Sequence, residues 1–188
     1  MPPGQGDRGP GASGLTRAAD LGSTLRQDLD VRVVYVDLDG TLMGPGGSLF
    51  AHPDGPTSEP AAAVGELHLA GVDLVLVSGR TRLQVSELAR ALGAAGYIAE
   101  IGGLIVQRRG RDEILTPNLG AFRGSGPGTP FEAIQRSGVV GMLLEEYRGR
   151  LEPHAPWAFL ERECSMLLRG DIDLDGARIG RASCRERV

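Results

Sequence analysis

Two aspartates at the end of an apolar run are the residues of this chain best suited to chemistry. Residues 31–36 are rich in valine, which predicts a strand, and they lead directly into Asp37 and Asp39. Because side chains alternate between the faces of a strand, the two carboxylates are expected on the same side. Carboxylates this close repel unless a cation lies between them, and Mg²⁺, a hard ion that prefers oxygen ligands, suits that position.

The residues after the aspartates support a site at this strand end. In an open α/β sheet of parallel strands, ligands bind at the carboxyl edge. Gly40 lets the chain turn away, and Thr41 is placed to cap the next segment or to hydrogen-bond an oxyanion. A strand that simply ends in an Asp-Gly turn explains Gly40, but it does not explain two aspartates on one face.

A second strand-like run, residues 72–77, ends in Ser78, Gly79 and Arg80, and leucines at helical spacing follow it. A small hydroxyl before a helix N-terminus can hold a phosphate through its side chain and the free backbone N–H groups. An N-cap serine is the ordinary alternative. We predict phosphate binding at Ser78 and Gly79, whereas Arg80 either reaches the same phosphate or is solvated.

The D-x-D-G-T-L string at 37–42 and the S-G-R string at 78–80 resemble two motifs of the haloacid dehalogenase (HAD) superfamily of phosphohydrolases. The resemblance implies that Asp37 is a nucleophile that forms an aspartyl-phosphate, and that Asp39 is the general acid and then the base. It also implies Mg²⁺ held by the Asp37 carboxylate and the Asp39 backbone carbonyl. The S-G-R form of the second motif resembles that of the sugar-phosphatase branch, whose members carry a large cap. This branch includes proteins similar to the mannosyl-3-phosphoglycerate phosphatases.

A third stretch, residues 96–106, is predicted to form two short strands around a glycine pair. It resembles the I-x-E-N-G-A segment of the capped HAD phosphatases, but Ile101, Gly102 and Gly103 stand where Asn-Gly-Ala is usual. Glu100 is therefore only a weak site candidate, and a structural role is the favoured interpretation.

The expected metal shell is incomplete in this chain. All 20 basic residues are arginine, whereas the resemblance requires a third-motif Lys or Arg and a fourth motif of the form G-D-x-x-x-D. The string at 170–175 matches the fourth motif, with Asp171 and Asp175 as candidate metal ligands. No basic third motif precedes it, however, so a turn with helix-cap aspartates is the favoured interpretation.

Composition limits the class of protein. The 188 residues allow about one domain and part of a second, and a net charge of −4 argues against a nucleic-acid-binding surface. No apolar run approaches the roughly 18 to 20 residues that span a bilayer, and no apolar core of about 7 to 15 residues marks a signal peptide. Cys164 and Cys184 form neither a disulfide framework nor a metal-ligand spacing. We expect a cytoplasmic protein whose partner is a small phosphorylated metabolite, with the oligomeric state left open.

The chain is expected to have four parts. Residues 1–30 are a leader without fixed structure, 31–120 the first part of the core, 121–178 a partial α+β cap, and 179–188 a translated sequencing adapter. The loop 43–57 contains too much glycine and proline for a helix. A helix follows, capped by Thr57 or Ser58 and ended by Gly71.

The cap is expected to begin near Phe131 and to contain apolar runs at 139–144 and 166–168. Trp157 and Phe159 are assigned to its core rather than to a substrate platform. Half of a parallel sheet would leave an apolar edge strand unpaired.

The sequence thus predicts an α/β protein with a Rossmann-like HAD core and an inserted α+β cap, truncated within the cap. The expected activity is Mg²⁺-dependent hydrolysis of a small phosphomonoester, of the sugar-phosphate or phosphoglycerate type, and the 188-residue chain alone is expected to be inactive. A phosphomutase with the same aspartyl-phosphate and a non-catalytic phosphate-binding fragment are the alternatives. Cap residues choose the substrate, so the sequence does not separate hydrolase from mutase.

Overall fold

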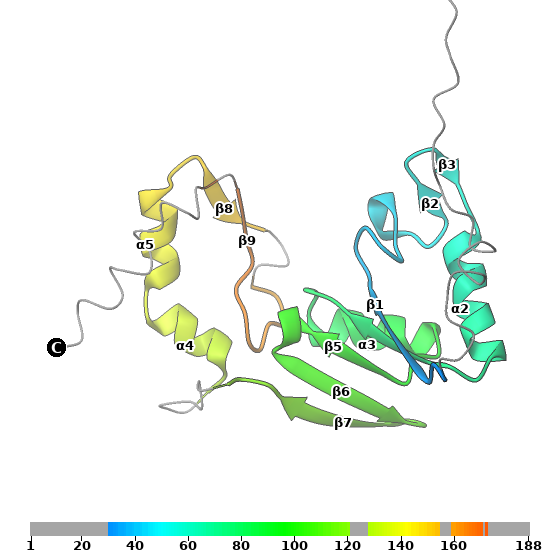
Figure 1. Cartoon of the computed structure of the whole chain (residues 1–188). Coiled ribbons are helices and arrows are strands. Elements are labelled where there is room, and N and C mark those ends of the chain that lie inside the picture. The colour runs from blue at the N-terminus through cyan, green and yellow to red at the C-terminus, as the bar shows by residue number, and fades with distance from the viewer. Residues whose placement is uncertain (1–29, 121–127, 155–158, 171, 173–188) are drawn as a thin grey trace, which may run out of the picture. The chain divides into compact units, whose positions relative to one another are not determined.

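The main layer is a five-stranded mixed sheet in the order β1-β4-β5-β6-β7 (Figure 1). Strands β4 (Asp73–Val77) and β5 (Gly96–Ala99) run parallel to β1 (Val33–Asp37). Strands β6 (Leu104–Arg109) and β7 (Asp112–Pro117) follow as antiparallel neighbours. Parallel strands joined through helices confirm the predicted α/β, Rossmann-like class.

The computed structural model describes residues 30–120, 128–154, 159–170 and 172. Nearly all of these belong to a unit that spans residues 32–188. The expected leader up to residue 29, the tail 179–188, the candidate ligands Asp171 and Asp175, and Trp157 and Cys184 lie outside the described residues. In the part described, no helix is long and apolar enough to cross a membrane.

Two helices connect the parallel strands and pack on them. Helix α2 (Glu59–Leu69) contacts β4, and helix α3 (Arg82–Ala91) contacts β4 and β5. The N-terminus of α2 agrees with the prediction, because the Thr57 Oγ1 accepts a hydrogen bond from the Glu59 N–H at 3.2 Å. Gly71, two residues beyond the helix, takes the left-handed φ of 69° that ends it.

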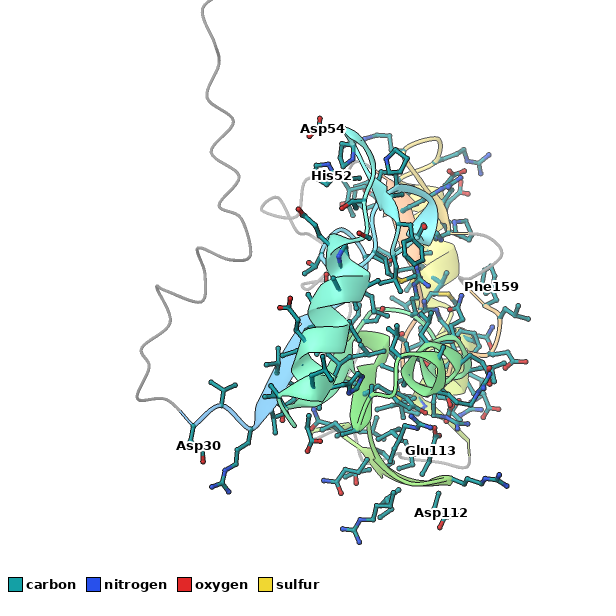
Figure 2. All side chains as sticks on the ribbon, turned by 90° about the vertical axis from the view of Figure 1, so that its right-hand side faces the viewer. Asp30, His52, Asp54, Asp112, Glu113 and Phe159 are labelled. Carbon is teal, nitrogen blue, oxygen red and sulfur yellow. The ribbon has the colours of Figure 1, made fainter. Side chains whose placement is uncertain are left out.

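The loop between β1 and α2 contains no α-helix, as predicted. It forms a single 3₁₀ turn, η1 (Pro45–Gly47), and a short antiparallel hairpin of β2 (Ala51–His52) and β3 (Gly55–Pro56). Figure 2 shows His52 and Asp54 at the tip of this hairpin, where the Asp54 N–H donates to the His52 Nδ1 at 3.2 Å. Of the two roles predicted for Thr41, capping of the next segment is not observed, because the N-cap of η1 is Gly44.

The core lies on one face of the sheet. Alternate residues of β4 are buried beneath the two helices, and the register places β5 and β6 side chains beside them. The buried side chains of this face are Val64, Leu74, Leu76, Val85, Ala89, Tyr97, Ala99, Leu104 and Val106. The hydroxyl of Tyr97 donates to the Glu113 Oε2 at 2.8 Å, which satisfies its one polar group.

The opposite face of the sheet keeps apolar side chains exposed. Val33 and Tyr35 on β1 are 39% and 64% exposed, and they line a cavity of about 430 Å³ together with Val75, Ile98 and Ile105. Within the described residues, β1 is also an outer strand that pairs only with β4. The outer edge of β1, which pairs with no described strand, matches the apolar edge that the sequence predicts, and such edges favour association.

An α+β segment, residues 128–154 and 159–170, follows the sheet. It contains α4 (Pro130–Arg136), α5 (Val139–Glu146) and an antiparallel pair of β8 (Leu151–Pro153) with β9 (Leu168–Gly170). Helix α4 includes Phe131, where the cap was predicted to begin, and helix α5 includes the apolar run 139–144.

One core assignment in this segment is wrong. Phe159 is 44% exposed, and Figure 2 shows its side chain pointing away from the ribbon. The sequence around Phe159, with alanine and proline just before it and charged residues soon after, carries no periodic signal that separates a buried position from an exposed one.

We expect Tyr35→Lys to lower self-association of the chain while changing its stability by no more than about 0.5 kcal/mol, because the side chain is exposed on the outer strand. Light scattering and urea unfolding at matched concentrations measure the two effects. The matched control is Val34→Lys, whose side chain shares a face with buried Leu74 and should destabilise by about 2 kcal/mol or more. Unchanged light scattering for Tyr35→Lys would show that self-association does not occur through the outer edge of β1.

Candidate active site

The two aspartates of the first motif lie together at the carboxyl end of β1. Strand β1 ends at Asp37, Leu38 turns inward with no exposed surface, and Asp39 returns to the open side. Asp37 and Asp39 both line one cavity of about 520 Å³. The two carboxylates therefore lie in one cavity at the carboxyl end of β1, as the sequence predicts.

Backbone hydrogen bonds hold the turn after the strand. The carbonyl of Leu38 accepts from the N–H groups of Thr41 at 3.4 Å and Met43 at 2.7 Å. Gly40 has a φ of 86°, a value that non-glycine residues rarely adopt, and this explains the glycine of the motif. Buried Leu42 and Met43 then anchor the turn in the core.

Thr41 acts on the first aspartate rather than on a helix. Its hydroxyl donates to the Asp37 Oδ2 at 3.0 Å. One oxygen of Asp37 is thus oriented by a neighbour four residues away. Thr41 was also predicted to contact phosphate, and that contact stays a prediction.

The second motif forms the loop after β4, the strand adjacent to β1. Gly79 and Arg80 line the cavity with the aspartates, whereas Ser78 is only 4% exposed. The Ser78 hydroxyl accepts from the Arg80 N–H at 3.1 Å, and its own N–H donates to the Ile98 carbonyl at 2.9 Å. Ser78 therefore orders the loop, and its direct contact with phosphate stays a prediction.

Arg80 forms a two-pronged ion pair with Asp39. Its Nε lies 2.9 Å from the Asp39 Oδ2 and its Nη2 lies 2.5 Å from the Asp39 Oδ1. This ion pair was not among the alternatives predicted for Arg80, and the contact of Arg80 with phosphate stays a prediction. The turn η1 approaches the same guanidinium, since a Cβ on Gly47 would lie 3.1 Å from the Arg80 Nη2. Arg80 is thus held at the mouth of the cavity, beside the second aspartate.

A strained turn holds the second-motif loop from behind. Glu100 and Ile101 have left-handed φ values of 51° and 57°, which is unusual for a branched side chain such as that of Ile101. The Glu100 N–H donates to the Arg80 carbonyl at 3.0 Å, and the Ile101 N–H donates to the Ser78 carbonyl at 3.3 Å. Backbone strain of this kind persists only where surrounding contacts determine it, and here those contacts fix the loop.

The carboxylate of Glu100, in the 3₁₀ turn η2 (Glu100–Gly102) after β5, contacts residues 163–165. Glu100 is 2% exposed, and its oxygens accept from the N–H groups of Glu163, Cys164 and Ser165 at 2.8 to 2.9 Å. The Ser165 hydroxyl donates to it as well, at 2.8 Å. The structural role favoured for Glu100 from the sequence is confirmed.

Arg162 brings the same segment to the cavity. It is 5% exposed, and its Nη2 donates to the Gly79 carbonyl at 3.2 Å while its Nη1 donates to the Ser165 Oγ at 2.8 Å. Burial lowers the pKa of the Arg162 guanidinium, and the Glu100 carboxylate 3.9 Å away acts in the opposite direction. Sequence reasoning did not find Arg162, because 83 residues separate it from Gly79 and no motif marks it.

The remaining cavity walls also come from residues that the sequence analysis did not select, namely Gln84, His154 and Leu167. Gln84 had a usable signal. Thr81 and Gln84 form a reciprocal capping box at the start of α3, and the T-x-x-Q spacing announces such a box. No local pattern marks His154 or Leu167, which reach the cavity through the fold of the α+β segment.

The donor set at the strand end fits a magnesium ion in part. The Asp37 carboxylate and the Asp39 carbonyl offer hard oxygen donors, and Mg²⁺ commonly uses one or two carboxylates together with water and substrate phosphate. Among the described residues, no group of three or more His, Cys, Asp or Glu side chains could hold a metal ion. Burial raises the pKa of the Cys164 thiol to about 11, so this sulfur is a protonated thiol rather than a thiolate ligand.

Comparison with known proteins gives structural matches without sequence matches. No family model matches the chain, and no curated protein does. The crystal structure of Thermoplasma acidophilum 0175 matches with a TM-score of 0.53 at 18% identity, over 82% of this chain and 58% of that one. A haloacid dehalogenase-like hydrolase from B. subtilis gives a TM-score of 0.41 at 20% identity, over 65% of this chain and 36% of that one. Aspergillus fumigatus trehalose-6-phosphate phosphatase gives 0.38 at 19% identity, over 81% and 51%.

The match to the Thermoplasma acidophilum structure shows a shared fold and nothing more, since the identity is 18%. The other two likenesses are too distant to carry an argument. The chain spans 36% to 58% of the length of these three structures.

We expect Glu100→Gln to destabilise the protein by about 2 to 4 kcal/mol, because an amide nitrogen would face N–H donors that now share a buried carboxylate. Urea unfolding measures the change. The control is Glu145→Gln, which removes an exposed ion pair with Arg148 and should cost less than about 0.5 kcal/mol. Equal stabilities of the two variants would contradict the role given to Glu100.

Proposed function

We propose that the protein to which this chain belongs is a phosphomonoester hydrolase of the HAD superfamily that works through an aspartyl-phosphate. One observation carries the proposal. Asp37 and Asp39 stand exposed at the end of β1, in the same cavity as Gly79 and Arg80 from the end of the adjacent parallel strand. The resemblance of both motifs to that superfamily supports the same reading.

In the first step, an oxygen of Asp37 attacks phosphorus and the bond from phosphorus to the leaving alcohol breaks. Thr41 orients the Asp37 carboxylate through its 3.0 Å hydrogen bond, which leaves the other oxygen for attack. Asp39 donates a proton to the departing oxygen. For this to happen, the ion pair between Asp39 and Arg80 must open, and the incoming phosphate provides Arg80 with a competing anionic partner.

In the second step, Asp39 accepts a proton from water as the water oxygen attacks the phosphorus of the aspartyl-phosphate. The bond between phosphorus and the Asp37 oxygen breaks, and phosphate leaves. Splitting the hydrolysis in this way replaces one difficult displacement with two easier ones. The same carboxyl is acid in one step and base in the other.

Charge on the transferring phosphoryl group needs cations near it. When bound by the Asp37 carboxylate and the Asp39 carbonyl, Mg²⁺ would neutralise part of that charge. The chain has no lysine, and the arginines that line the cavity are Arg80 and Arg162. Backbone N–H groups of the loop at Gly79 add further donors.

The cavity volume of about 520 Å³ lies within the range of about 300 to 1,000 Å³ that is typical of small-molecule sites. We therefore assign a small phosphorylated metabolite as the substrate, of the sugar-phosphate or phosphoglycerate type. A site of this kind is in keeping with the expected cytoplasmic location.

Asp37→Asn in the parent protein should lower hydrolysis of p-nitrophenyl phosphate by about 1,000-fold or more, because an amide cannot act as the nucleophile. Circular dichroism should remain unchanged. Asp54→Asn is the matched control, since this aspartate is exposed on the hairpin tip, and it should keep full activity. Activity of Asp37→Asn within tenfold of the unmodified protein would rule out Asp37 as the nucleophile.

Asp39→Asn should slow decay of the phosphorylated protein by about 100-fold, the scale of a positioned acid or base. Rapid-quench measurement of the bound phosphate follows this decay. Arg80→Gln is the comparison, because it also breaks the ion pair but leaves the Asp39 carboxyl in place. If both variants decay alike, the effect belongs to the ion pair, and Asp39 is not the base.

A further inference from the structure

Gln84 lines the cavity, and its side-chain amide oxygen is fixed by Thr81. Its Oε1 accepts from the Thr81 N–H and from the Thr81 hydroxyl, both at 3.2 Å. The amide is planar, so fixing the oxygen also fixes the Nε2 at its other end. Among the described residues, that nitrogen makes no hydrogen bond, and Gln84 is half-buried in the cavity wall.

The identity of the two ends of this amide follows from its partners. The Thr81 N–H can only donate, so the atom facing it must be the oxygen. The opposite end is therefore an NH₂ group with two protons to offer. The Gln84 backbone N–H returns to the Thr81 Oγ1 at 3.4 Å, and the buried Thr81, 2% exposed, holds the arrangement rigid.

A second group on the same cavity wall also lacks an internal partner. The Nδ1 of His154 is buried and makes no hydrogen bond within the described part of the chain, and His154 lines the cavity with Gln84. The His154 backbone is fixed separately, because its N–H donates to the Leu167 carbonyl at 3.1 Å. The His154 Nδ1 has almost no accessible surface, so the half-buried Gln84 amide is the group of the two that a ligand in the cavity can reach.

The hydrogen-bond donors of the cavity wall indicate what kind of ligand group fits beside them. Arg80 and Arg162 line the same cavity and also carry only donors, whereas the acceptors there, Asp37 and Asp39, belong to the reacting end. The part of the ligand beside Gln84 is therefore best matched by an oxygen that accepts hydrogen bonds. A site built to hydrogen-bond a substrate group rejects analogues that lack the group.

We propose that the Gln84 side-chain amide is a specificity-determining donor that selects phosphomonoesters whose leaving alcohol carries an acceptor oxygen, as a hydroxyl or a carboxylate. The inference rests on the proposed function, since it places the phosphate at Asp37 and Gly79 and the rest of the substrate toward Gln84. It adds which residue reads the substrate and what that residue requires.

The test is calorimetric binding of three non-hydrolysable ligands to the full chain with Mg²⁺ present: propylphosphonate, 3-hydroxypropylphosphonate and 3-phosphonopropionate. The first has no acceptor beyond the phosphonate, the second adds a hydroxyl and the third a carboxylate. We expect the unmodified chain to bind at least one acceptor ligand about tenfold more tightly than propylphosphonate, as one hydrogen bond provides. The ligand that gains more identifies the source of the acceptor.

Two variants complete the test. Gln84→Met keeps the side-chain length without the amide. It should bind the acceptor ligands and propylphosphonate with about equal affinity, and its affinity for propylphosphonate should equal that of the unmodified chain. Gln84→Glu retains the capping box but replaces the donors with a carboxylate. It should bind 3-phosphonopropionate more weakly than 3-hydroxypropylphosphonate, because like charges then face each other.

The outcomes distinguish the role of Gln84 from the existence of the phosphate site. Binding of propylphosphonate without any preference for the acceptor ligands, or a preference that survives in Gln84→Met, would overturn the role of Gln84 and leave the phosphate site intact. An equal loss for all three ligands in Gln84→Met would make Gln84 a helix cap only. No binding of propylphosphonate to the unmodified chain would overturn the proposed phosphate site, and the inference with it.

Discussion

The buried carboxylate of Glu100 is the interaction on which the site depends. Its two oxygens accept four hydrogen bonds from residues 163–165, and its backbone N–H holds the carbonyl of Arg80. One residue thus joins the second-motif loop of the sheet to the segment that carries Arg162. A buried charge with this many donors is stable, whereas the same charge without them would be costly. The left-handed backbone at 100–101 accompanies these contacts.

The catalytic edge depends on a second constraint, the parallel register of β1 and β4. Asp37 is paired with Val77, so the turn after β1 and the loop after β4 leave the sheet at the same level. Asp39 and Arg80, separated by 41 residues, then meet in an ion pair. Glu100 and this register together bring side chains from three parts of the chain to one cavity: the end of β1, the start of α3 and the α+β segment.

The sequence predicted those features that local patterns encode. Short runs of β-prone, apolar residues indicated β1 and β4, and the Asp-Gly-Thr and Ser-Gly-Arg strings marked the loops after them. Thr57 and Gly71 bounded α2 as expected. The structural role of Glu100 also followed from its sequence neighbours. Each of these signals lies within a few residues of the feature that it predicts.

Four other features were not predictable in this way. Arg162 reaches Gly79 across 83 residues, and His154 enters the cavity from β8 and its following loop. Thr41 donates to Asp37 instead of capping the next segment, whose N-cap is Gly44. Phe159 is exposed although it is aromatic, since the neighbouring residues give no period that assigns it a face. Contacts between distant residues decided the first two features, whereas the last two lie in segments whose local pattern does not separate the alternatives.

The central claim is that Asp37 carries the phosphoryl group, and chemical trapping tests it most directly. The parent protein is mixed with acetyl phosphate and Mg²⁺ and quenched in acid, borohydride then reduces any acyl phosphate, and the peptides are sequenced by mass spectrometry. If Asp37 is the nucleophile, homoserine replaces aspartate at position 37 and nowhere else. Homoserine at another aspartate, or phosphate release from acetyl phosphate with position 37 unmodified, would contradict it.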